Sequence, residues 1–459
     1  MYTYMLCHVR VGLDRSLALG LDAISIKMEA FLNWCASRGI TWHEDLNLVH
    51  TDGEGGGVQA LKPIAQGATC FTVPRKVALS AESIGEKSLA ASLAPKHALA
   101  LAACEVKTKD QYAPWLALWP RDTEGTWQLD AETRSTLSWC RELGKLDADE
   151  SAAAVRALSE VIEPGLIAAG RERAMPSEEE YRWGLGIVSS RAADVIISGE
   201  ARPTILPLID MMNHRSKHEA TVALSFDSDL DAVVAKVVTP DGVAAGMSLT
   251  INYGAKDNAQ LLHGYGFACR PNPHDTVLVR VPIGATDSGP DPLALQRVAM
   301  LPRGLFDSSD SDGGSKAAFG MLSWQSCGGS FVPSLSADIR VLLAMASATS
   351  IEEMFGAMSM AAAAGQINDE GHEEGGKHDA VFDSSSLPQA AWELLAKCCA
   401  DTLDALPAPL AAPQEKVAEA GARIQRAAAV ALEARRDLLK MTYNAAKEAV
   451  AASRTPSLN

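Results

Sequence analysis

The sequence predicts an α+β protein whose β-rich part is interrupted by helices and followed by an all-helical C-terminal part. Short runs typical of strands occur between residues 46 and 73 and again between 204 and 253. Between them the sequence is rich in alanine and leucine with helical periodicity. We therefore place an N-terminal extension at 1–27, a β-rich domain at 28–280 with a helical insertion at about 81–193, and an all-α domain at 281–459.

The first part begins with an amphipathic helix around Phe31 and Trp34, followed by three short extended runs. Glycines at 53, 55–57 and 67 separate these runs, as expected of tight turns between strands. The predicted strands are 46–49, 58–61 and 70–73.

The helical insertion and the second β-rich stretch follow in that order. Alanine and leucine favour helices in the insertion, whereas β-branched runs between Asp-rich and Gly-containing turns favour strands after it. The predicted helices are 99–106, 152–162 and 178–190, and the predicted strands are 204–209, 220–226, 232–238 and 248–253.

The C-terminal third is helical by composition and periodicity. Two tracts near 305–316 and 366–386 have few residues to bury, so we expect mobile surface loops there. An apolar seven-residue repeat in the last helix leaves a coiled coil open, but the repeat is mostly alanine and Gly421 interrupts it, which favours a packed helix. The predicted helices are 337–345, 351–364, 387–406 and 414–452.

Composition excludes several classes of function. The 459 residues carry 41 Lys and Arg against 57 Asp and Glu, a net charge of −16, which argues against a nucleic-acid partner. Apolar runs are far shorter than the ~20 residues that cross a bilayer, so we expect no membrane segment. The nine cysteines are odd in number and contain no Cys-x-x-Cys pair, which disfavours a disulfide framework or a cysteine zinc site.

The remaining sequence signals concern metals and location. His214, His218 and Glu219 could supply metal ligands, but their order does not match a His-Glu-x-x-His helix, and we expect no metal. The N-terminus lacks the apolar core of a secretory signal. We expect an intracellular monomer, and a chloroplast location stays open.

Three stretches carry candidate chemistry: Gly53-Glu54-Gly55-Gly56-Gly57, Asp210-Met211-Met212-Asn213-His214, and Asn252-Tyr253-Gly254 leading to Tyr265-Gly266-Phe267. Taken singly, each has a plain structural interpretation. A glycine cluster between strands is usually a turn, Asn-His can end a strand, and a tyrosine often packs with only its hydroxyl in water.

In this order and combination, the stretches resemble the SET-domain methyltransferases, and specifically the branch that includes the plant Rubisco large-subunit lysine methyltransferase. The resemblance is strongest over 205–267, covers most of 28–275, and is fainter in the C-terminal domain. It implies a knotted β-rich SET domain with an inserted helical block and a C-terminal substrate-binding domain. The order of β, helical and β stretches in the sequence agrees with it.

The resemblance implies S-adenosyl-L-methionine as the methyl donor and assigns roles to individual residues. Glu54 and Gly56 would offer backbone groups to the cofactor, and Arg191 would meet its carboxylate. Asn213 and His214 would hold its amino group and adenine. Glycine allows close backbone approach, and a guanidinium fork suits a carboxylate. The branch commonly has a bulky apolar residue where this chain has Gly56, which puts the strength of cofactor binding in doubt.

Two tyrosines complete the implied site. Tyr253 would be the catalytic tyrosine beside the transferring methyl group, and Tyr265 would line the substrate channel. The actin-histidine methyltransferases of the branch lack a tyrosine at the position of Tyr265, so its presence favours lysine as the acceptor. Asn258 is interpreted as the cap of the short helix that follows it.

The function that we infer is transfer of a methyl group to a lysine of a protein substrate. The resemblance offers the Rubisco large subunit and fructose-bisphosphate aldolase as candidate substrates without choosing between them and other proteins. Two alternatives stay open: a protein-histidine methyltransferase, and a catalytically inactive SET-domain scaffold that binds a partner. The number of methyl groups added is not decided by the sequence.

Overall fold

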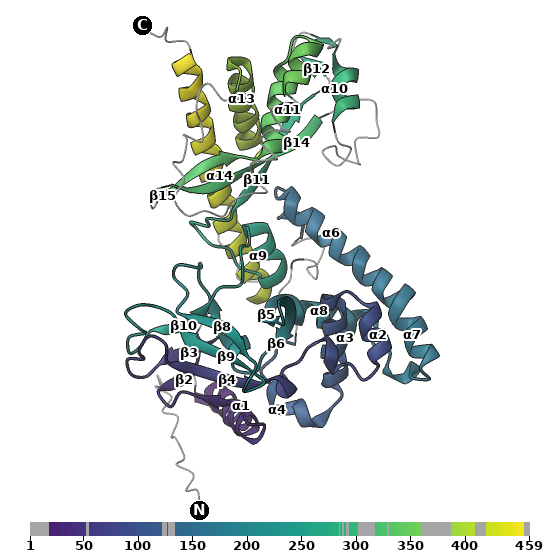
Figure 1. Ribbon diagram of the computed structural model, residues 1–459, viewed down its shortest axis with the longest axis vertical. Helices are drawn as coiled ribbons and strands as arrows, with labels where there is room; N and C mark the ends of the chain where they lie inside the picture. The colour runs from purple at the N-terminus through teal and green to yellow at the C-terminus, as the bar shows by residue number, and fades with distance from the viewer. Residues whose placement is uncertain are drawn as a thin grey trace, which may run out of the picture. The chain divides into compact units, whose positions relative to one another are not determined.

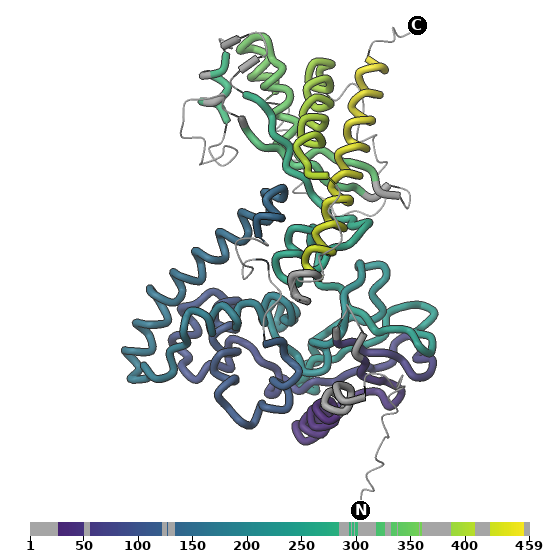
Figure 2. Tube along the Cα trace, turned by 180° about the vertical axis from the view of Figure 1, so that it is seen from behind, coloured from purple at the N-terminus to yellow at the C-terminus, as the bar shows by residue number. Residues whose placement is uncertain are grey.

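The computed structural model describes most of the chain, and it divides into two compact units (Figures 1 and 2). The first unit is 1–128 with 147–254, and the second is 129–146 with 255–459. The described residues are 18–51, 55–121, 126, 134–283, 285–286, 289–290, 293–301, 317–327, 330–357, 359, 387–408 and 419–453. The predicted loops near 305–316 and 366–386 lie outside the described residues.

The described residues of the first unit form two four-stranded sheets and a strand pair. The sheet orders are β1-β4-β9-β8 and β2-β3-β10-β7, and β5 pairs with β6. All pairings are antiparallel except that of β7 with β10, in which Asn213 lies opposite Thr250. The strands are β1 (Thr41–Trp42), β2 (Leu46–Thr51), β3 (Gly55–Ala60), β4 (Thr69–Pro74), β5 (Ala192–Ile197), β6 (Glu200–Ile205), β7 (Asn213–His214), β8 (Val222–Asp227), β9 (Ala232–Val237) and β10 (Ser248–Ile251).

Helices of the first unit come mainly from the insertion between β4 and β5. Ser177 and Glu180 form a capping box that starts α8, and Arg191 is the last residue of this helix. The helices are α1 (Ala18–Ser37), α2 (Lys87–Ser92), α3 (Pro95–Lys107), α4 (Ala113–Leu116), α7 (Glu163–Ala168) and α8 (Glu178–Arg191). Helix α6 (Arg141–Arg156) belongs to the second unit up to residue 146 and to the first from residue 147, and a π-helical segment at Ala157–Ile162 joins it to α7.

One apolar core joins these elements. Phe31 of α1, Phe71 of β4, Leu99 of α3 and Leu185 of α8 are all fully buried and belong to the same cluster. The apolar stripe of α3 is broad, because residues 98–104 are all buried between the sheet side and α8. The helical insertion is therefore part of the core that positions the strands.

The second unit is largely helical, as predicted, but it also contains a sheet that the sequence analysis did not expect. Strands β11 (Thr276–Pro282), β14 (Ala317–Cys327) and β15 (Ser330–Leu335) form an antiparallel sheet in the order β11-β14-β15. Val277, Val279 and Val281 alternate into the core, packing against α11 and α13. The short strands β12 (Ala285–Thr286) and β13 (Gly289–Pro290) pair separately.

The helices of the second unit include one long terminal helix. α14 (Glu419–Ser453) packs along α13 (Gln389–Ala405), and its Leu438 and Leu439 are fully buried, so the interpretation as a packed helix is confirmed (Figures 1 and 2). The other helices are α9 (Asn258–Tyr265), α10 (Ala294–Met300), α11 (Ala337–Ser347) and a helical segment at 351–357.

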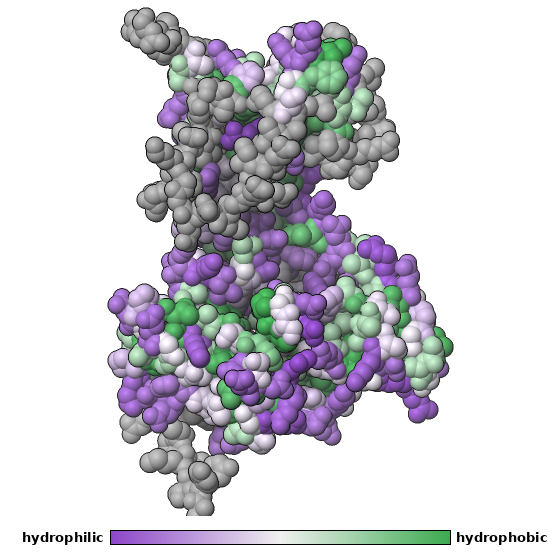
Figure 3. Space-filling model, in the orientation of Figure 1, coloured by the Kyte–Doolittle hydropathy of each residue, from purple (hydrophilic) through white to green (hydrophobic). Residues whose placement is uncertain are grey.

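The predicted fold class, a β-rich part with inserted helices before a helical C-terminal part, is confirmed, but the C-terminal part is not all-α because it contains the sheet β11-β14-β15. The predicted domain borders at 28–280 and 281–459 stay a prediction; the compact units instead place 129–146 and 255–280 with the C-terminal residues. On the face that Figure 3 shows, hydrophilic and hydrophobic residues are interspersed over the described part of the surface. Among the described residues, none of the helices is long and apolar enough to cross a membrane.

Candidate functional site

The segment 206–214 forms the centre of the candidate site in the first unit. The predicted strand at 204–209 is wrong in its second half, because β6 ends at Ile205 and a 3-10 turn at Ile209–Met211 follows. Leu206, Leu208 and Ile209 are buried, and burial of these apolar side chains carries the turn into the core. Leu208 has φ 70, a strained conformation for a residue with a side chain.

Asp210 enters the core with this turn and is held by two partners from the helical insertion. Its side chain is only 1% exposed. Trp115 donates its indole N–H to Asp210 Oδ2 at 3.1 Å. Arg191 Nη1 donates to the Asp210 backbone oxygen at 3.2 Å and lies 3.6 Å from Oδ2. Burial raises the pKa of Asp210, while the Arg191 charge and the Trp115 hydrogen bond oppose this shift.

The ion pair leaves donor and acceptor capacity unused. Arg191 Nε and Asp210 Oδ1 are buried and have no hydrogen-bond partner among the described residues. Buried polar atoms in proteins are nearly always paired, so the unpaired Nε of Arg191 indicates a place where a further polar group belongs. Arg191 keeps about a fifth of its side chain exposed, which leaves part of the guanidinium within reach of a ligand.

Tyr253 fixes the other side of the same segment. Its hydroxyl donates to the Met212 backbone oxygen at 2.7 Å, and its backbone N–H donates to His214 Nδ1 at 3.1 Å. Since Nδ1 accepts, a neutral His214 carries its proton on Nε2. Burial raises the pKa of Tyr253, so its phenol stays protonated at neutral pH.

The glycines of β3 lie against this segment from a third side. A Cβ atom on Gly56 would lie 3.1 Å from Met211 Cε, and one on Gly57 would lie 3.5 Å from Asn213 Nδ2. The space that a larger residue at 56 would need is therefore occupied by Met211. Without side chains, the β3 backbone can approach a ligand closely along this edge.

No family model matches the chain, but individual proteins do. Over 107 residues it is 37% identical to a ribosomal lysine N-methyltransferase of Schizosaccharomyces pombe, covering 22% of this chain and 19% of that protein. Over 313 residues it is 24% identical to the actin-histidine N-methyltransferase of Drosophila melanogaster, covering 60% of this chain and 55% of that protein. The chain thus spans between about a fifth and just over half of the length of these curated relatives.

Solved structures match over nearly the whole length. The SET domain of LSMT bound to lysine and AdoHcy has a TM-score of 0.62 at 16% identity, covering 93% of this chain and 92% of that one. Rubisco LSMT bound to AdoMet has a TM-score of 0.60 at 17% identity, covering 93% of each chain. This chain has a SET-domain fold. The SET fold predicted from the sequence motifs is confirmed.

The SET fold brings most of the predicted site residues together. Five of them lie around the segment 210–214 of the first unit: Gly56, Arg191, Asn213, His214 and Tyr253. Glu54 lies outside the described residues. The cofactor and catalytic roles assigned to these residues stay predictions, since they depend on the bound molecule.

Tyr265 is the last residue of α9 and belongs to the second unit. Its half-buried ring lies 5.9 Å from the Phe267 ring, centroid to centroid, and Lys256 Nζ lies 5.9 Å from the Tyr265 ring centroid. A cation over a tyrosine face is weakly attractive. The surroundings of Tyr265 are therefore aromatic on one side and cationic on another.

The interpretation of Asn258 as a helix cap is wrong. Asp257 caps α9, accepting from Gln260 N in a capping box, while Asn258 is already the first helical residue. The Asn258 side chain is buried and donates to Cys269 O at 3.0 Å and to Asp275 Oδ2 at 2.8 Å. Asn258 therefore ties the helix to the loop that follows Tyr265, a structural role as predicted but by other contacts.

Two residues that position the site were missed. Asp210 stood within a quoted motif without a role, although a lone acid among buried apolar residues signals a buried charge that needs partners. Trp115 lies 95 residues away from Asp210, and nothing in the sequence links the two. Among the described residues, no group of three or more His, Cys, Asp or Glu side chains could hold a metal ion.

Proposed function

We propose that this chain is a protein methyltransferase that uses S-adenosyl-L-methionine and modifies a lysine side chain. One observation carries the proposal: residues from β3, α8, β7 and the end of β10, far apart in the sequence, meet at the segment 210–214 of a SET fold. They are the same residues to which the family resemblance assigns cofactor binding and catalysis.

The donors present fit the polar groups of the cofactor. Arg191 has a buried Nε without a partner among the described residues and a partly exposed guanidinium, which suits a carboxylate. The Asn213 side chain has no hydrogen-bond partner among the described residues and lies beside Gly57. Its amide can accept from an ammonium group or donate to a purine nitrogen.

When bound, the cofactor supplies an electrophilic methyl carbon on a sulfonium ion. The protein must then position a neutral amine and exclude water. A free lysine has a pKa of about 10.4, so at pH 7.4 its neutral form costs about 4 kcal/mol. An apolar channel lowers that pKa by disfavouring the ammonium. The Tyr253 hydroxyl stays protonated and donates to Met212 O, so its oxygen has a fixed position. It would act on the methyl transfer through its dipole and would not accept a proton.

Lysine is favoured over histidine by Tyr265. The relatives include enzymes named for each acceptor, a ribosomal lysine methyltransferase and actin-histidine methyltransferases. Tyr265 is present where the resemblance gives the histidine enzymes no tyrosine. The Rubisco large subunit and fructose-bisphosphate aldolase remain candidate substrates, and the protein-histidine activity and an inactive scaffold remain the competing functions.

The test is transfer of a radiolabelled methyl group from S-adenosyl-L-methionine into proteins of plastid and cytosolic extracts, with the modified side chain mapped by mass spectrometry. We expect one labelled acceptor modified on lysine, and no label with the Tyr253→Phe variant. Label on histidine would support the methyltransferase activity but would contradict lysine as the acceptor. Binding of the cofactor without any labelled acceptor would favour the scaffold.

A further inference from the structure

The glycine segment 55–57 of β3 has a strand partner on only one of its two edges. On that edge it pairs with β2, where Gly56 lies opposite His50. On the other edge, β10 pairs with β3 at Gln59 and Val58 and then pairs with β7. Among the described strands, none therefore continues the sheet beside 55–57. Glycine in a strand often marks a place where a ligand approaches the backbone closely, and this edge allows such an approach.

The glycines make this edge accessible, but they also leave it without packing of its own. Gly55, Gly56 and Gly57 follow one another at the start of β3. Glycine has more conformational freedom to lose than any other residue. A backbone that binds a ligand through its N–H and C=O groups must be fixed beforehand, because ordering it during binding costs affinity. The packing that fixes this part of β3 must therefore come from other segments.

Met211 supplies this packing at Gly56. Its Cε atom lies 3.1 Å from the position that a Cβ atom on Gly56 would take, which is closer than ordinary van der Waals contact. The Met211 side chain is half-buried and packs against the core of the first unit. Methionine suits this place because its flexible side chain fills irregular gaps. On Gly57 the cover comes from Val49 of β2, whose Cγ2 lies 3.4 Å from the corresponding Cβ position.

The backbone on both sides of Met211 is held by residues of the candidate site. Arg191 Nη1 donates to Asp210 O at 3.2 Å, immediately before Met211. The Tyr253 hydroxyl donates to Met212 O at 2.7 Å, immediately after it. Met211 therefore reaches β3 from a segment that two predicted site residues already fix in place.

We propose that Met211 is a positioning residue for binding of the methyl donor. From outside the strand it supplies the apolar side chain that β3 lacks at position 56, and it thereby fixes the Gly56 backbone before the cofactor binds. This inference rests on the proposed function, because it requires the cofactor to bind at β3. Met211 acts through the β3 backbone, so its loss should lower cofactor affinity and leave the rate of methyl transfer at saturating cofactor unchanged.

The first test compares affinities for S-adenosyl-L-methionine by titration calorimetry. Met211→Ala should bind about three- to tenfold more weakly, the effect of one further flexible group that must be ordered on binding. Met211→Leu keeps an apolar side chain of similar volume and should stay within about twofold of wild type.

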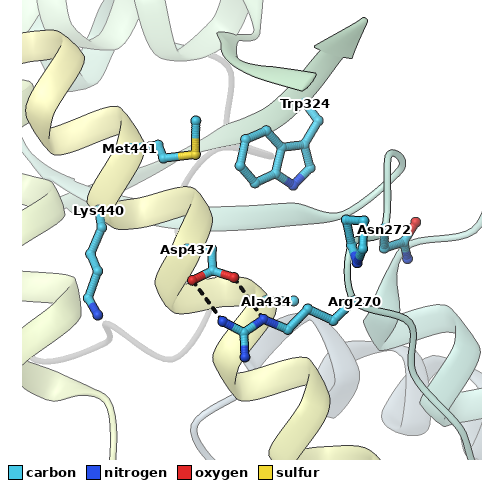
Figure 4. A pocket seen from close by; sticks show the side chains of 8 residues that line it. Arg270, Asn272, Trp324, Ala434, Asp437, Lys440 and Met441 are labelled. Atoms are coloured by element: carbon cyan, nitrogen blue, oxygen red, sulfur yellow. Dashed lines mark hydrogen bonds and ion pairs between the residues drawn. The ribbon is translucent and has the colours of Figure 1, made fainter. Parts of the chain in front are cut away.

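Met441→Ala is the matched control, because it removes the same atoms from a methionine outside the candidate site. Met441 belongs to the second unit, where it lies beside Trp324 in a cleft of about 540 Å³ and is 43% exposed (Figure 4). We expect this variant to bind S-adenosyl-L-methionine with wild-type affinity.

The second test moves the apolar side chain from position 211 to position 56. Gly56 does not have a positive φ, so leucine can adopt its backbone conformation. Gly56→Leu alone should weaken cofactor binding, because its side chain competes with Met211 Cε for the same space. Gly56→Leu combined with Met211→Ala should return to within about threefold of wild-type affinity, since one apolar side chain again fills that space.

Hydrogen exchange of the cofactor-free protein gives a readout that does not depend on binding. The peptide that contains Gly55–Ala60 should exchange faster in Met211→Ala than in wild type, because the β3 backbone opens more readily without its cover. The combined variant and Met441→Ala should exchange at about the wild-type rate in the same peptide.

The outcomes separate this inference from the proposed function. Wild-type protein that binds no S-adenosyl-L-methionine would overturn both. If wild type binds the cofactor, equal affinity in Met211→Ala would overturn the inference and leave the proposed function standing. A combined variant that binds no better than Met211→Ala, or a Met211→Ala variant whose transfer rate falls at saturating cofactor while its affinity is unchanged, would do the same.

Discussion

At the scale of single residues, Tyr253 is the group whose removal should separate catalysis from binding. Its hydroxyl is held by Met212 O at 2.7 Å, so Tyr253→Phe removes one fixed dipole and little else. We expect methyl transfer to fall about 10²–10³-fold, the usual effect of losing one positioned group, with cofactor affinity nearly unchanged. Single-turnover rates and titration calorimetry measure the two quantities. Tyr443→Phe on α14 is the control, and transfer at the wild-type rate in Tyr253→Phe would remove this residue from the mechanism.

Substitution of Arg191 should mainly lower the affinity for the cofactor, because its contacts favour a role in cofactor binding. Arg191→Ala removes the guanidinium beside Asp210 and leaves that buried carboxylate without its ion pair. We expect cofactor affinity to fall at least about tenfold, the order of one charge-assisted hydrogen bond. Arg202→Ala, which breaks an exposed pair with Glu82, is the matched control. Equal affinities for the two variants in calorimetry would show that Arg191 does not bind the cofactor.

Asp275 accepts hydrogen bonds from Asn258, the first residue of α9, and should make the free energy of unfolding depend on pH. Burial raises its pKa to about 6, although Asn258 donates to it twice. An unfolded aspartate has a pKa of about 3.9, so the folded state holds an extra proton between about pH 4 and 6. The free energy of unfolding contributed by Asp275 therefore falls as pH rises through that window and is constant above it.

Asp275→Asn should remove this dependence. The difference in unfolding free energy between variant and wild type should shift in favour of the variant by about 2–3 kcal/mol from pH 4 to 6.5, measured by urea unfolding. Asp404→Asn, at an exposed position on α13, is the control for the substitution itself. Parallel curves for Asp275→Asn and wild type would show that the folded pKa is not raised.

How much of the site the sequence could predict depends on where the partners lie. Asn213, His214 and Tyr253 were named as candidates because short motifs carry them, and Arg191 because the family resemblance assigns it a role. Asp210 was seen but given no role, and its hydrogen bond from Trp115 could not be predicted, since it crosses 95 residues. A short motif shows which functional residues are close in the sequence. The residues that orient them can come from distant segments and are brought together only by the packing of the fold.

At the scale of elements, the helical insertion should stabilise the 206–214 segment through the hydrogen bond from Trp115 to Asp210. Trp115→Phe keeps an aromatic ring but leaves a buried carboxylate oxygen without its donor, at a cost of about 1.5–3 kcal/mol besides the lost volume. Trp183→Phe is the control, because the Trp183 indole donates to a neutral acceptor, Pro120 O, and should cost about 1 kcal/mol for its hydrogen bond. Equal losses of unfolding free energy in the two variants, measured with denaturant, would mean that the charge of Asp210 does not strengthen the Trp115 hydrogen bond.

The elements themselves were predictable where their periodicity was clear. The helices at 99–106 and 178–190 and the strands at 220–226 and 232–238 correspond to α3, α8, β8 and β9. The sheet of the second unit was missed although residues 276–282 alternate, because the rest of the C-terminal third was interpreted as helical. In the prediction, helix propensity over the C-terminal third counted for more than the short alternating pattern at 276–282. In the structure, packing against the core stabilises strands there.

At the scale of the whole molecule, the chain does not divide where its composition changes. Residues 129–146 come before the last strands of the first unit in sequence yet belong to the second unit. Glu142 explains why: its carboxylate accepts from both terminal nitrogens of Arg435 at 2.9 Å and from Leu278 N. These contacts cross 293 and 136 residues, so no local pattern could place the border.

The Glu142–Arg435 pair should therefore control the stability of the second unit. The two side chains are only 11% and 8% exposed, so Glu142→Gln leaves a buried guanidinium uncompensated, which costs about 3–5 kcal/mol. Glu433→Gln disturbs more exposed pairs with Arg270 and Arg436 and should cost at most about 1 kcal/mol. Adding Arg435→Met to Glu142→Gln should recover most of the loss, because neither member of the buried pair then carries a charge. Urea unfolding measures all three, and a loss in Glu142→Gln no larger than in Glu433→Gln would show that packing alone assigns residues 129–146 to the second unit.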